Sequence, residues 1–199
     1  MSLNYDLLLR MLGCFAIGAI PFAIIAMWGT GIDIRSVGSG NPGFNNVLRV
    51  DKKRAILCLI GDLGKGAAAV WLFTQPADPH FYGWAYGFGA VFGHCYSPFL
   101  RFNGGKGIAT SAGVMLILFP IWAAAALVFF TLLRLLGSRR RWPEAGMIAS
   151  VSTWVFFTLM MFLYFSGIDA RFAALMTVFL AWRHKQNFRN LLGPKRAPA

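Results

Sequence analysis

The sequence has few charged residues, and this scarcity excludes most classes of soluble protein. Asp, Glu, Lys and Arg make up 13% of the 199 residues, whereas 57% of the residues are hydrophobic. A single soluble core of this size cannot bury that much apolar surface. The composition therefore predicts an integral membrane protein that is surrounded by membrane lipid.

Cysteine is scarce as well. The three cysteines, Cys14, Cys58 and Cys95, lie scattered inside apolar runs. An odd and scattered set gives neither a disulfide framework nor a paired metal motif. We interpret these cysteines as packing residues, and we predict that the protein uses no metal and no cofactor.

Acidic residues are the rarest charged group, with 7 Asp and Glu against 19 Lys and Arg and a formal net charge of +12. Such an excess is typical of nucleic-acid binding when the basic residues form a continuous stripe. Here they lie in short connectors between apolar runs, which is typical of charges that orient a membrane protein. We therefore predict no nucleic-acid partner.

The sequence does contain a series of apolar runs. A helix that crosses about 30 Å of hydrocarbon needs about 20 residues, so the first, second and sixth runs are long enough, whereas the third, fourth and seventh are short. We predict an all-α polytopic membrane protein with about seven transmembrane helices in one domain, residues 1–199. A five-helix alternative with re-entrant short runs keeps the same sidedness. The runs are 7–28, 55–73, 81–96, 108–119, 121–136, 145–165 and 168–182.

Lys and Arg gather in alternate connectors, as they do on the cytoplasmic side of membrane proteins. The connectors after the first, third and fifth runs and the C-terminal tail are basic, whereas those after the second and fourth runs carry no Lys or Arg. We predict an outside N-terminus and a cytoplasmic C-terminus. The cytoplasmic cations would be Arg35, Arg49, Lys52, Lys53, Arg54, Arg101, Lys106, Arg134, Arg139, Arg140, Arg141, Arg183, Lys185, Arg189, Lys195 and Arg196.

The first glycine-rich stretch, GSGNPGFNNVLR at 38–49, lies in the first of these basic connectors. Its glycines allow close backbone approach to a ligand, its Ser and Asn side chains are neutral donors, and its Arg is a fork-shaped cation. The pattern fits a phosphate nest, and it fits equally a turn with an anchoring Arg. The candidate phosphate-binding residues are Ser39, Gly40, Asn41, Asn46 and Arg49.

The second glycine-rich stretch, FNGGKGIATSAG at 102–113, precedes an apolar run and places Lys106 among glycines. Backbone N–H groups at a helix start attract an anion, and Lys106 adds a point charge. The stretch lacks the P-loop pattern, and a flexible basic linker is the alternative. The candidate phosphate-binding residues are Gly104, Gly105, Lys106, Gly107 and Thr110.

The tail RHKQNFRN at 183–190 contains Arg183, His184 and Asn187. His184 and Asn187 share one face if the seventh helix continues through them. His184 is suited to contact a phosphate or to assist proton transfer near neutral pH, and the alternative is a solvated residue at a helix end. We expect His94, before Pro98, to be structural.

Asp62 and Lys65 lie deep in the second run. A single charge at mid-bilayer costs on the order of 3 kcal/mol on insertion scales. Their spacing lets them pair, so we predict a structural ion pair that braces the loops from beneath.

Taken together, these stretches resemble the bacterial membrane acyl-phosphate:glycerol-3-phosphate acyltransferases, the PlsY family. The resemblance covers nearly the whole chain, in order and at family-like spacing. The matching motifs are GSGN-x-G-xx-NVLR at 38–49, D-x-x-KG at 62–66, GH-x-x-P-x-x-x-F-x-GGKG-x-AT at 93–110 and RH-x-x-N at 183–187.

The resemblance implies a seven-span enzyme of the bacterial inner membrane whose active site faces the cytoplasm. Such an enzyme moves a fatty acyl group from acyl phosphate to the 1-hydroxyl of glycerol 3-phosphate, and it releases phosphate and lysophosphatidic acid for phospholipid synthesis. Neither CoA nor acyl carrier protein is the direct donor, and no protein partner is required. Lys106, His184 and Asn187 would be catalytic, and together with Ser39, Arg49 and the glycines they would hold the phosphates, with Arg183 beside them.

This chemistry needs no enzyme nucleophile, because acyl phosphate is already an activated mixed anhydride. Positioning of the hydroxyl and stabilisation of charge can supply most of the acceleration. No HxxxxD motif is present. The proton acceptor is either the substrate phosphate or His184.

The chain departs from the family pattern at several positions. Phe44 and Asn45 stand where the family usually has Ala-Thr, Glu144 lies where a Ser-rich stretch is expected, and Phe188 and Asn190 change the tail. A carboxylate at 144 would repel phosphate unless a neighbouring Arg screens it. These changes keep open a different hydroxylated or phosphorylated acceptor. An organic-phosphate transporter is the other alternative, although no internal repeat supports it.

Overall fold

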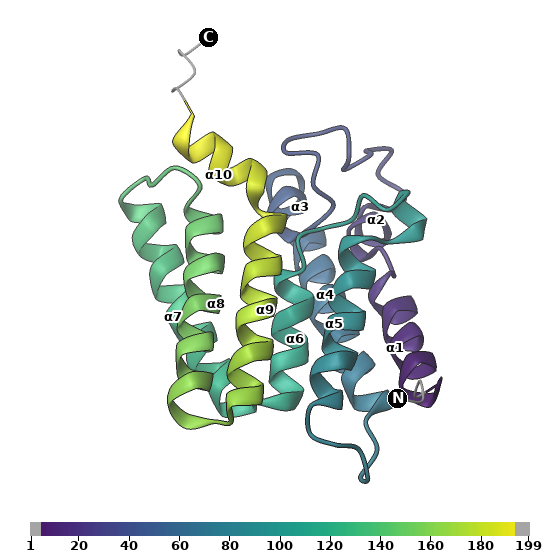
Figure 1. Ribbon diagram of the computed structural model, residues 1–199. Helices are drawn as coiled ribbons and strands as arrows, with labels where there is room; N and C mark the ends of the chain where they lie inside the picture. Colours follow the sequence, from purple (N-terminus) through teal and green to yellow (C-terminus); the bar gives the residue numbers. More distant parts are fainter. Residues whose placement is uncertain (1–4, 194–199) are drawn as a thin grey trace. The chain divides into compact units, whose positions relative to one another are not determined.

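The computed structural model describes residues 5–193, which form helices and no strand, so the all-α prediction is confirmed (Figure 1). The chain divides into two compact units, Met1–Ile121 and Trp122–Ala199. The first unit contains both glycine-rich loops.

The first predicted span is broken in two. Helix α1 covers Tyr5–Gly18, and helix α2 covers Phe22–Met27. Pro21 lies at the break, and proline cannot donate the backbone hydrogen bond that a continuous helix needs. The two pieces together are still long and apolar enough to cross a membrane, as predicted.

Two buried side chains satisfy backbone carbonyls at this break. The Ser97 hydroxyl donates to the carbonyl of Ala19 at 2.6 Å, and Lys65 Nζ donates to the carbonyl of Ile20 at 2.7 Å. Carbonyls left unpaired in an apolar interior cost free energy, so these contacts stabilise the broken helix. They also tie the break to two other segments of the first unit.

Helix α3, Phe44–Val50, directly precedes helix α4, Lys52–Phe73. Asp51 separates them and caps α4, because its carboxylate accepts from the backbone N–H groups of Lys53 at 2.8 Å and Arg54 at 3.0 Å. The sequence analysis placed these residues in a connector, as a phosphate nest or a turn, and predicted no helix there. The second half of the first glycine-rich stretch is therefore helical.

Helices α5, Tyr82–Cys95, and α6, Ile108–Leu118, are short and pack very closely on their neighbours. A Cβ atom on Gly66 of α4 would lie 2.0 Å from the carbonyl oxygen of Thr110 in α6, and Gly18 of α1 makes a similar approach to the backbone of α5. Small residues at helix contacts allow this approach in membrane proteins. The close packing fixes where the loop before α6 begins and ends.

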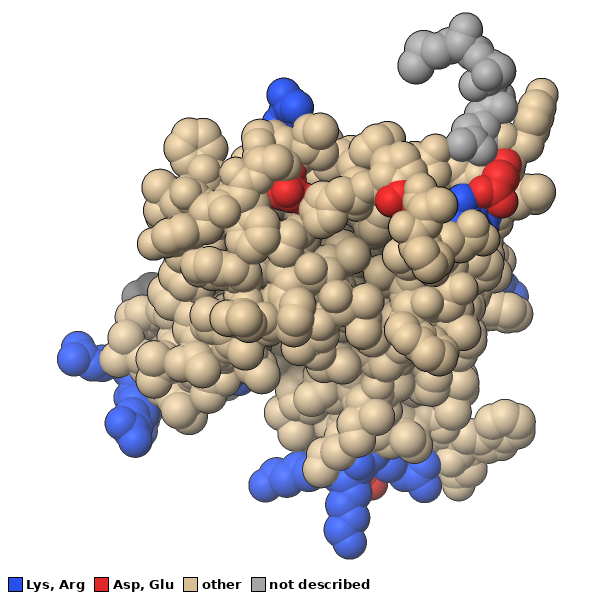
Figure 2. All heavy atoms as spheres, turned by 90° about the horizontal axis from the view of Figure 1, so that it is seen from below, with Lys and Arg blue, Asp and Glu red and all other residues tan. Residues whose placement is uncertain are grey.

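At the end of the first unit opposite to the glycine-rich loops, charged side chains hold a loop in place. Arg10 donates to both carboxylate oxygens of Asp78, at 2.9 and 2.8 Å, and to the carbonyl of Phe73 at 3.1 Å. Burial raises the pKa of Asp78, but hydrogen bonds from the Gln75 backbone, Arg10 and the Tyr86 hydroxyl together hold that pKa below its usual value. The loop 74–81 is therefore held by side chains. Seen from this end, most of the surface is uncharged (Figure 2).

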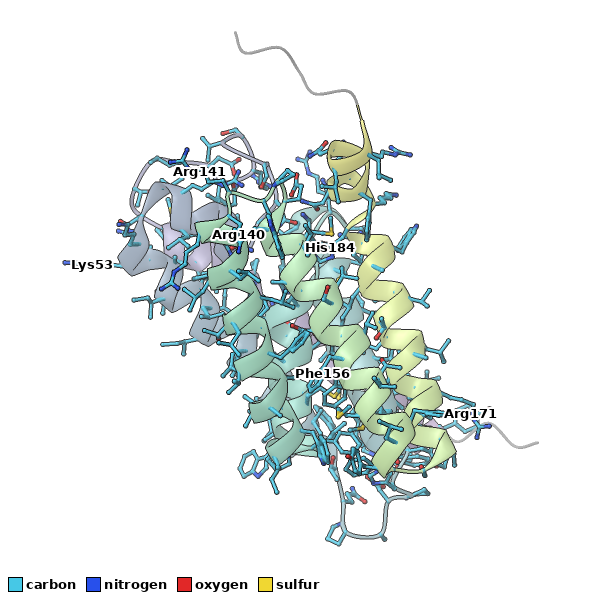
Figure 3. All side chains as sticks on the ribbon, turned by 90° about the vertical axis from the view of Figure 1, so that its left-hand side faces the viewer. Lys53, Arg140, Arg141, Phe156, Arg171 and His184 are labelled. Carbon is cyan, nitrogen blue, oxygen red and sulfur yellow. The ribbon has the colours of Figure 1, made fainter. Side chains whose placement is uncertain are left out.

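The second unit is a set of helices that run side by side and end in a short helix. Aromatic pairs hold α7 against α8, including Phe129 with Phe156 at 4.6 Å between ring centroids. Figure 3 shows Arg140, Arg141 and His184 at one end of these helices and Arg171 at the other. The helices are α7, Pro120–Arg139; α8, Ala145–Tyr164; α9, Gly167–Arg183; and α10, Lys185–Leu192.

Four helical segments among residues 5–193 are long and apolar enough to cross a membrane. Helix α6 is apolar but shorter, as predicted for the fourth run, and α5 and α9 correspond to the other two runs predicted to be short. The exact number of spans stays a prediction. The cations Lys195 and Arg196 lie outside the described residues.

Candidate active site

The first glycine-rich loop turns through two glycines with left-handed backbone. Gly38 has φ of 57° and Gly40 has φ of 68°. A Cβ on Gly38 would lie 2.4 Å from the side-chain oxygen of Asn46, so this position excludes a side chain for two reasons. The conformation and the space both require glycine at 38.

Asn46 holds this loop from inside. Its Nδ2 donates to the carbonyls of Ile34 at 2.9 Å and Val37 at 3.0 Å, and its Oδ1 accepts from the Ser39 backbone N–H at 3.0 Å. Both amide hydrogens are thus used within the loop. Asn46 was predicted to bind phosphate, whereas this geometry makes it the residue that shapes the loop.

The remaining candidates of the first loop lie nearer the surface. Ser39 and Arg49 are exposed, and Gly40 and Asn41 are half-buried. The Cδ atom of Arg49 lies 3.9 Å from the position that a Cβ on Gly38 would take, so its side chain runs beside the left-handed turn. A hydroxyl and a guanidinium are therefore available at the same turn.

Phe44 does not place its ring among these groups. It begins α3 and packs against the buried cluster that contains Ile34 and Val47. From the sequence, Phe44 in place of the family's Ala is expected to put a bulky ring in the phosphate loop. The amphipathic start of α3 explains the difference, because the ring at 44 faces the core while Asn45 is exposed.

The second glycine-rich loop folds back onto the end of α5. The N–H of Gly104 donates to the carbonyl of Cys95 at 3.0 Å, and the N–H of Gly105 donates to the carbonyl of His94 at 3.2 Å. A Cβ on Gly105 would lie 2.1 Å from His94 Nε2. Glycine at this position lets the loop lie directly on the histidine ring.

The other candidates of the second loop lie at the start of α6. Gly107 has φ of 88° and is the N-cap residue of α6, and Lys106 before it is half-buried. Thr110 is fully buried at the contact with α4, and its hydroxyl has no hydrogen-bond partner among residues 5–193. The loop therefore offers Lys106 and a helix start to an anion, and Thr110 lies behind it.

A buried charged cluster lies beneath the two loops. Asp62 and Lys65 form an ion pair at 2.8 Å, and each side chain is 3% exposed. His94 Nδ1 lies 3.4 Å from Asp62 Oδ1, so the ring lies beside this carboxylate. Three charged or ionisable groups thus share one buried position in the first unit.

This cluster lines a cavity of about 10 Å³, which is room for about one water molecule. Pro42 of the first loop and Gly105 of the second loop line the same cavity. The two glycine-rich loops therefore converge above the cluster, at the position from which the sequence analysis expected the ion pair to brace them.

In the second unit, His184 separates α9 from α10. Its φ of −94° and ψ of 8° break the helix, so the face predicted for an unbroken helix is replaced by a junction. His184 is buried, and its Nδ1 lies 2.8 Å from the carbonyl of Leu180. A carbonyl only accepts, so Nδ1 donates to it, and in a neutral ring Nε2 would then be the acceptor. That tautomer is the one a proton acceptor needs.

Asn187 and Arg183 flank this histidine and are half-buried. Asn187 Nδ2 donates to Glu144 Oε2 at 2.6 Å, and Asn190 Nδ2 donates to Glu144 Oε1 at 3.1 Å. The carboxylate that would repel phosphate unless Arg140 or Arg141 screened it is thus bonded by two tail amides. Only the Asn and Glu positions, not their contact, were visible in the sequence.

The comparisons with known proteins agree with this architecture. The family described as glycerol-3-phosphate acyltransferase matches residues 8–193. A glycerol-3-phosphate acyltransferase of Cupriavidus pinatubonensis is 39% identical, over 96% of this chain and 95% of its own length. One from Burkholderia pseudomallei is 38% identical, over 94% of this chain and 92% of its own length.

Solved structures of PlsY (YgiH), an integral membrane glycerol 3-phosphate acyltransferase, are similar in fold. The glycerol 3-phosphate form has a TM-score of 0.81 at 27% identity and covers 94% of this chain and 92% of that chain. The lysophosphatidic acid form has a TM-score of 0.80 at 26% identity and covers 94% of this chain and 91% of that chain. The match over nearly the full length of these relatives establishes the resemblance read from the motifs: the chain belongs to the glycerol-3-phosphate acyltransferase family.

Proposed function

We propose that this protein transfers a fatty acyl group from acyl phosphate to the 1-hydroxyl of glycerol 3-phosphate, with lysophosphatidic acid and inorganic phosphate as products. The observation that carries the proposal is the convergence of two glycine-rich loops, with Arg49 and Lys106, in a chain of the glycerol-3-phosphate acyltransferase family. The solved relatives with glycerol 3-phosphate and with lysophosphatidic acid support the acceptor and the product.

The two loops are suited to hold phosphate groups. Arg49 offers a planar fork of donors, Lys106 offers a point charge, and the start of α6 adds backbone N–H groups. Asn46 and Thr110 act behind this surface, one by shaping the first loop and one by packing α6 on α4. The residues that we assign to phosphate binding are Ser39, Gly40, Asn41, Arg49, Gly104, Gly105, Lys106, Gly107 and Arg183.

The reaction proceeds by direct attack of the acceptor hydroxyl on the acyl carbonyl carbon. A new C–O ester bond forms, the C–O bond to phosphate breaks, and phosphate leaves with the bonding electrons. The hydroxyl proton goes to His184 Nε2 or to an oxygen of the substrate phosphate. Lys106 stabilises negative charge on the transferring group, and Asn187 orients the hydroxyl. Positioning and charge stabilisation carry the acceleration, because the donor is already activated.

The proposal includes a position in the bacterial inner membrane with the active site in the cytoplasm. The basic connectors support it, because Lys and Arg collect on the cytoplasmic side. In the first unit, the cations at 49–54 and at 101–106 adjoin the glycine-rich loops. We propose about seven spans in one catalytic domain, with the N-terminus outside and no required protein partner.

The test is release of inorganic phosphate from palmitoyl phosphate by the purified protein in detergent, with and without glycerol 3-phosphate. The Lys106→Ala variant is measured beside Lys53→Ala, a change of an exposed cation on α4 that serves as the matched control. Acceptor-dependent release that Lys106→Ala loses and Lys53→Ala keeps supports the proposal. Phosphate release at the same rate with and without glycerol 3-phosphate contradicts the proposal. So does release that both variants retain.

A different acceptor is the second candidate, and the contact of Glu144 with Asn187 favours it. A carboxylate at this position adds negative charge beside a residue assigned to the acceptor. The same assay with glycerol and other polyol phosphates tests this. If one of these compounds has a higher kcat/KM than glycerol 3-phosphate, that compound is the acceptor. Acyl phosphate remains the proposed donor.

A further inference from the structure

The backbone of Glu144 is held in an uncommon conformation between α7 and α8. Its φ is 53°, in the left-handed region that non-glycine residues rarely adopt. Its carbonyl accepts from the N–H groups of Met147 at 2.8 Å and Ile148 at 3.0 Å, so it begins α8. Just before it, the Trp142 N–H donates to the carbonyl of Gly137 at 2.8 Å. The position of Glu144 is thus determined on both sides.

This conformation brings the carboxylate of Glu144 against one face of α10. Asn187 and Asn190 are three residues apart and therefore neighbours on that face. Each donates from Nδ2 to a different carboxylate oxygen, at 2.6 and 3.1 Å. Gln186 Nε2 in turn donates to Asn190 Oδ1 at 3.1 Å. Both oxygens of Glu144 are engaged by amides of the tail.

The charge of Glu144 favours one orientation of the Asn187 amide. An ionised carboxylate only accepts, so it attracts Nδ2 and repels the carbonyl oxygen Oδ1. Oδ1 is therefore held on the other arm of the amide, where it can accept a hydrogen bond. A neutral side chain at 144 would remove this preference, because an amide or hydroxyl can pair with either arm.

We propose that Glu144 is a positioning residue that fixes Asn187 with Oδ1 as an acceptor for the hydroxyl of the acceptor substrate. This inference rests on the proposed function. It gives the tail two acceptors, Asn187 Oδ1 and His184 Nε2, which suit a hydroxyl group. Recognition of phosphate is then assigned to the glycine-rich loops and to Arg183. Glu144 stands where the family resemblance leads us to expect a Ser-rich stretch.

A purely structural role for Glu144 is the competing explanation, since its carboxylate also ties the start of α8 to α10. Asn190→Ala removes one of the two ties and leaves the contact with Asn187. Glu144→Gln keeps the size of the side chain and removes its charge. The comparison of these two variants separates orientation of Asn187 from attachment of α10.

The experiment measures kcat and KM for glycerol 3-phosphate at saturating palmitoyl phosphate. The proteins are the wild type, Glu144→Gln, Asn190→Ala, Asn187→Ala and the Glu144→Gln/Asn187→Ala double variant. We expect Glu144→Gln to lower kcat about tenfold, less than the hundredfold or more that follows loss of a catalytic hydrogen-bond donor. Asn190→Ala should change kcat less than twofold. In the Asn187→Ala background, Glu144→Gln should have no further effect, because residues that act as a unit are not additive.

Three results would overturn the inference. The first is that Glu144→Gln lowers kcat equally in the wild type and in the Asn187→Ala variant. The second is that Asn190→Ala lowers kcat as much as Glu144→Gln does. The third is that Glu144→Gln leaves kcat unchanged. Thermal unfolding of each variant in detergent identifies a loss that comes from misfolding. An inactive, folded wild type would refute the proposed function and this inference together, whereas an active wild type with additive variants refutes this inference alone.

Discussion

The two ends of the first unit are fixed by different kinds of interaction. At one end, the side chains of Arg10, Asp78 and Tyr86 bond to one another and hold the loop 74–81. At the other end, left-handed glycines, backbone hydrogen bonds and the uncharged amide of Asn46 hold the glycine-rich loops. At the first end, the charged side chains therefore stabilise the loop.

The second end leaves charge for a ligand. Arg49 is exposed beside a loop that does not depend on it for shape. The buried Asp62–Lys65 pair lies under this end, and Lys65 also donates to the carbonyl of Ile20 at the break between α1 and α2. A loop that is rigid without its cations is preorganised for an anion, which is the property that a phosphate site needs.

The largest effect is expected from the buried ion pair. Lys65→Met leaves Asp62 without its ion-pair partner and removes one of the two donors to the carbonyl of Ile20, the other being the Phe22 N–H. Breaking a buried pair costs about 3–5 kcal/mol. Chemical unfolding in mixed micelles should show this loss in the free energy of unfolding. The double variant Asp62→Asn/Lys65→Met should recover part of it. A double variant as unstable as the single one would argue against pairing as the stabilising element.

Removal of Arg49 should act on activity and not on stability. Loss of one charge-stabilising donor in an active site typically costs about 2.7–4 kcal/mol in kcat, or a hundredfold or more. We expect Arg49→Ala to lower acyl transfer by this order while the unfolding midpoint stays unchanged. Arg35→Ala is the matched control, because Arg35 lies in the same connector and pairs with Asp33. Equal losses in both variants would mean that net charge alone matters.

Gly38→Ala should disturb the shape of the first loop. A left-handed conformation costs a non-glycine residue about 1–2 kcal/mol, and the new Cβ would also displace Asn46. We expect a higher KM for glycerol 3-phosphate and a small loss of stability. Gly64→Ala is the control, because nothing lies within 4 Å of its Cβ position in the middle of α4. An unchanged KM in Gly38→Ala would show that the loop is not preorganised.

The smallest effect is expected from pH at the other end. The pKa of Asp78 lies below its usual value, so the stability that it contributes is complete above the unfolded pKa and is lost as pH falls through the folded pKa. The unfolding temperature should therefore fall in the acid range more steeply for the wild type than for Asp78→Asn. Activity at neutral pH should be similar in the two proteins. Parallel acid profiles would contradict a role for this carboxylate.

The helices and the membrane class could be predicted from the sequence because they depend on local composition. The second, fifth and sixth apolar runs predicted α4, α7 and α8 with ends close to those found. The break at Pro21 was not predicted, because residues 7–28 form one apolar run. The loops were found because glycine next to Lys or Arg is a local signal. Their convergence on one cavity depends on helix contacts that no local pattern contains.

The residues that shape the site were harder to predict. Asn46 read as one more neutral donor, and only its contacts with Ile34 and Val37 reveal its structural use. Glu144 read as a repulsive charge, because its contact with Asn187 joins residues that are distant in the sequence. In both cases the residue type was visible, and the partner depended on the packing of separate helices. The assembled site remains a prediction for the same reason.

Labelled glycerol 3-phosphate identifies both the acyl donor and the acceptor of the proposed reaction in one measurement. The purified protein is given palmitoyl phosphate or palmitoyl-CoA, and labelled lysophosphatidic acid is separated and counted. We predict product with palmitoyl phosphate, little or none with palmitoyl-CoA, and loss of product in Lys106→Ala. Product formed from palmitoyl-CoA alone, or no product from a folded protein with either donor, would contradict the account.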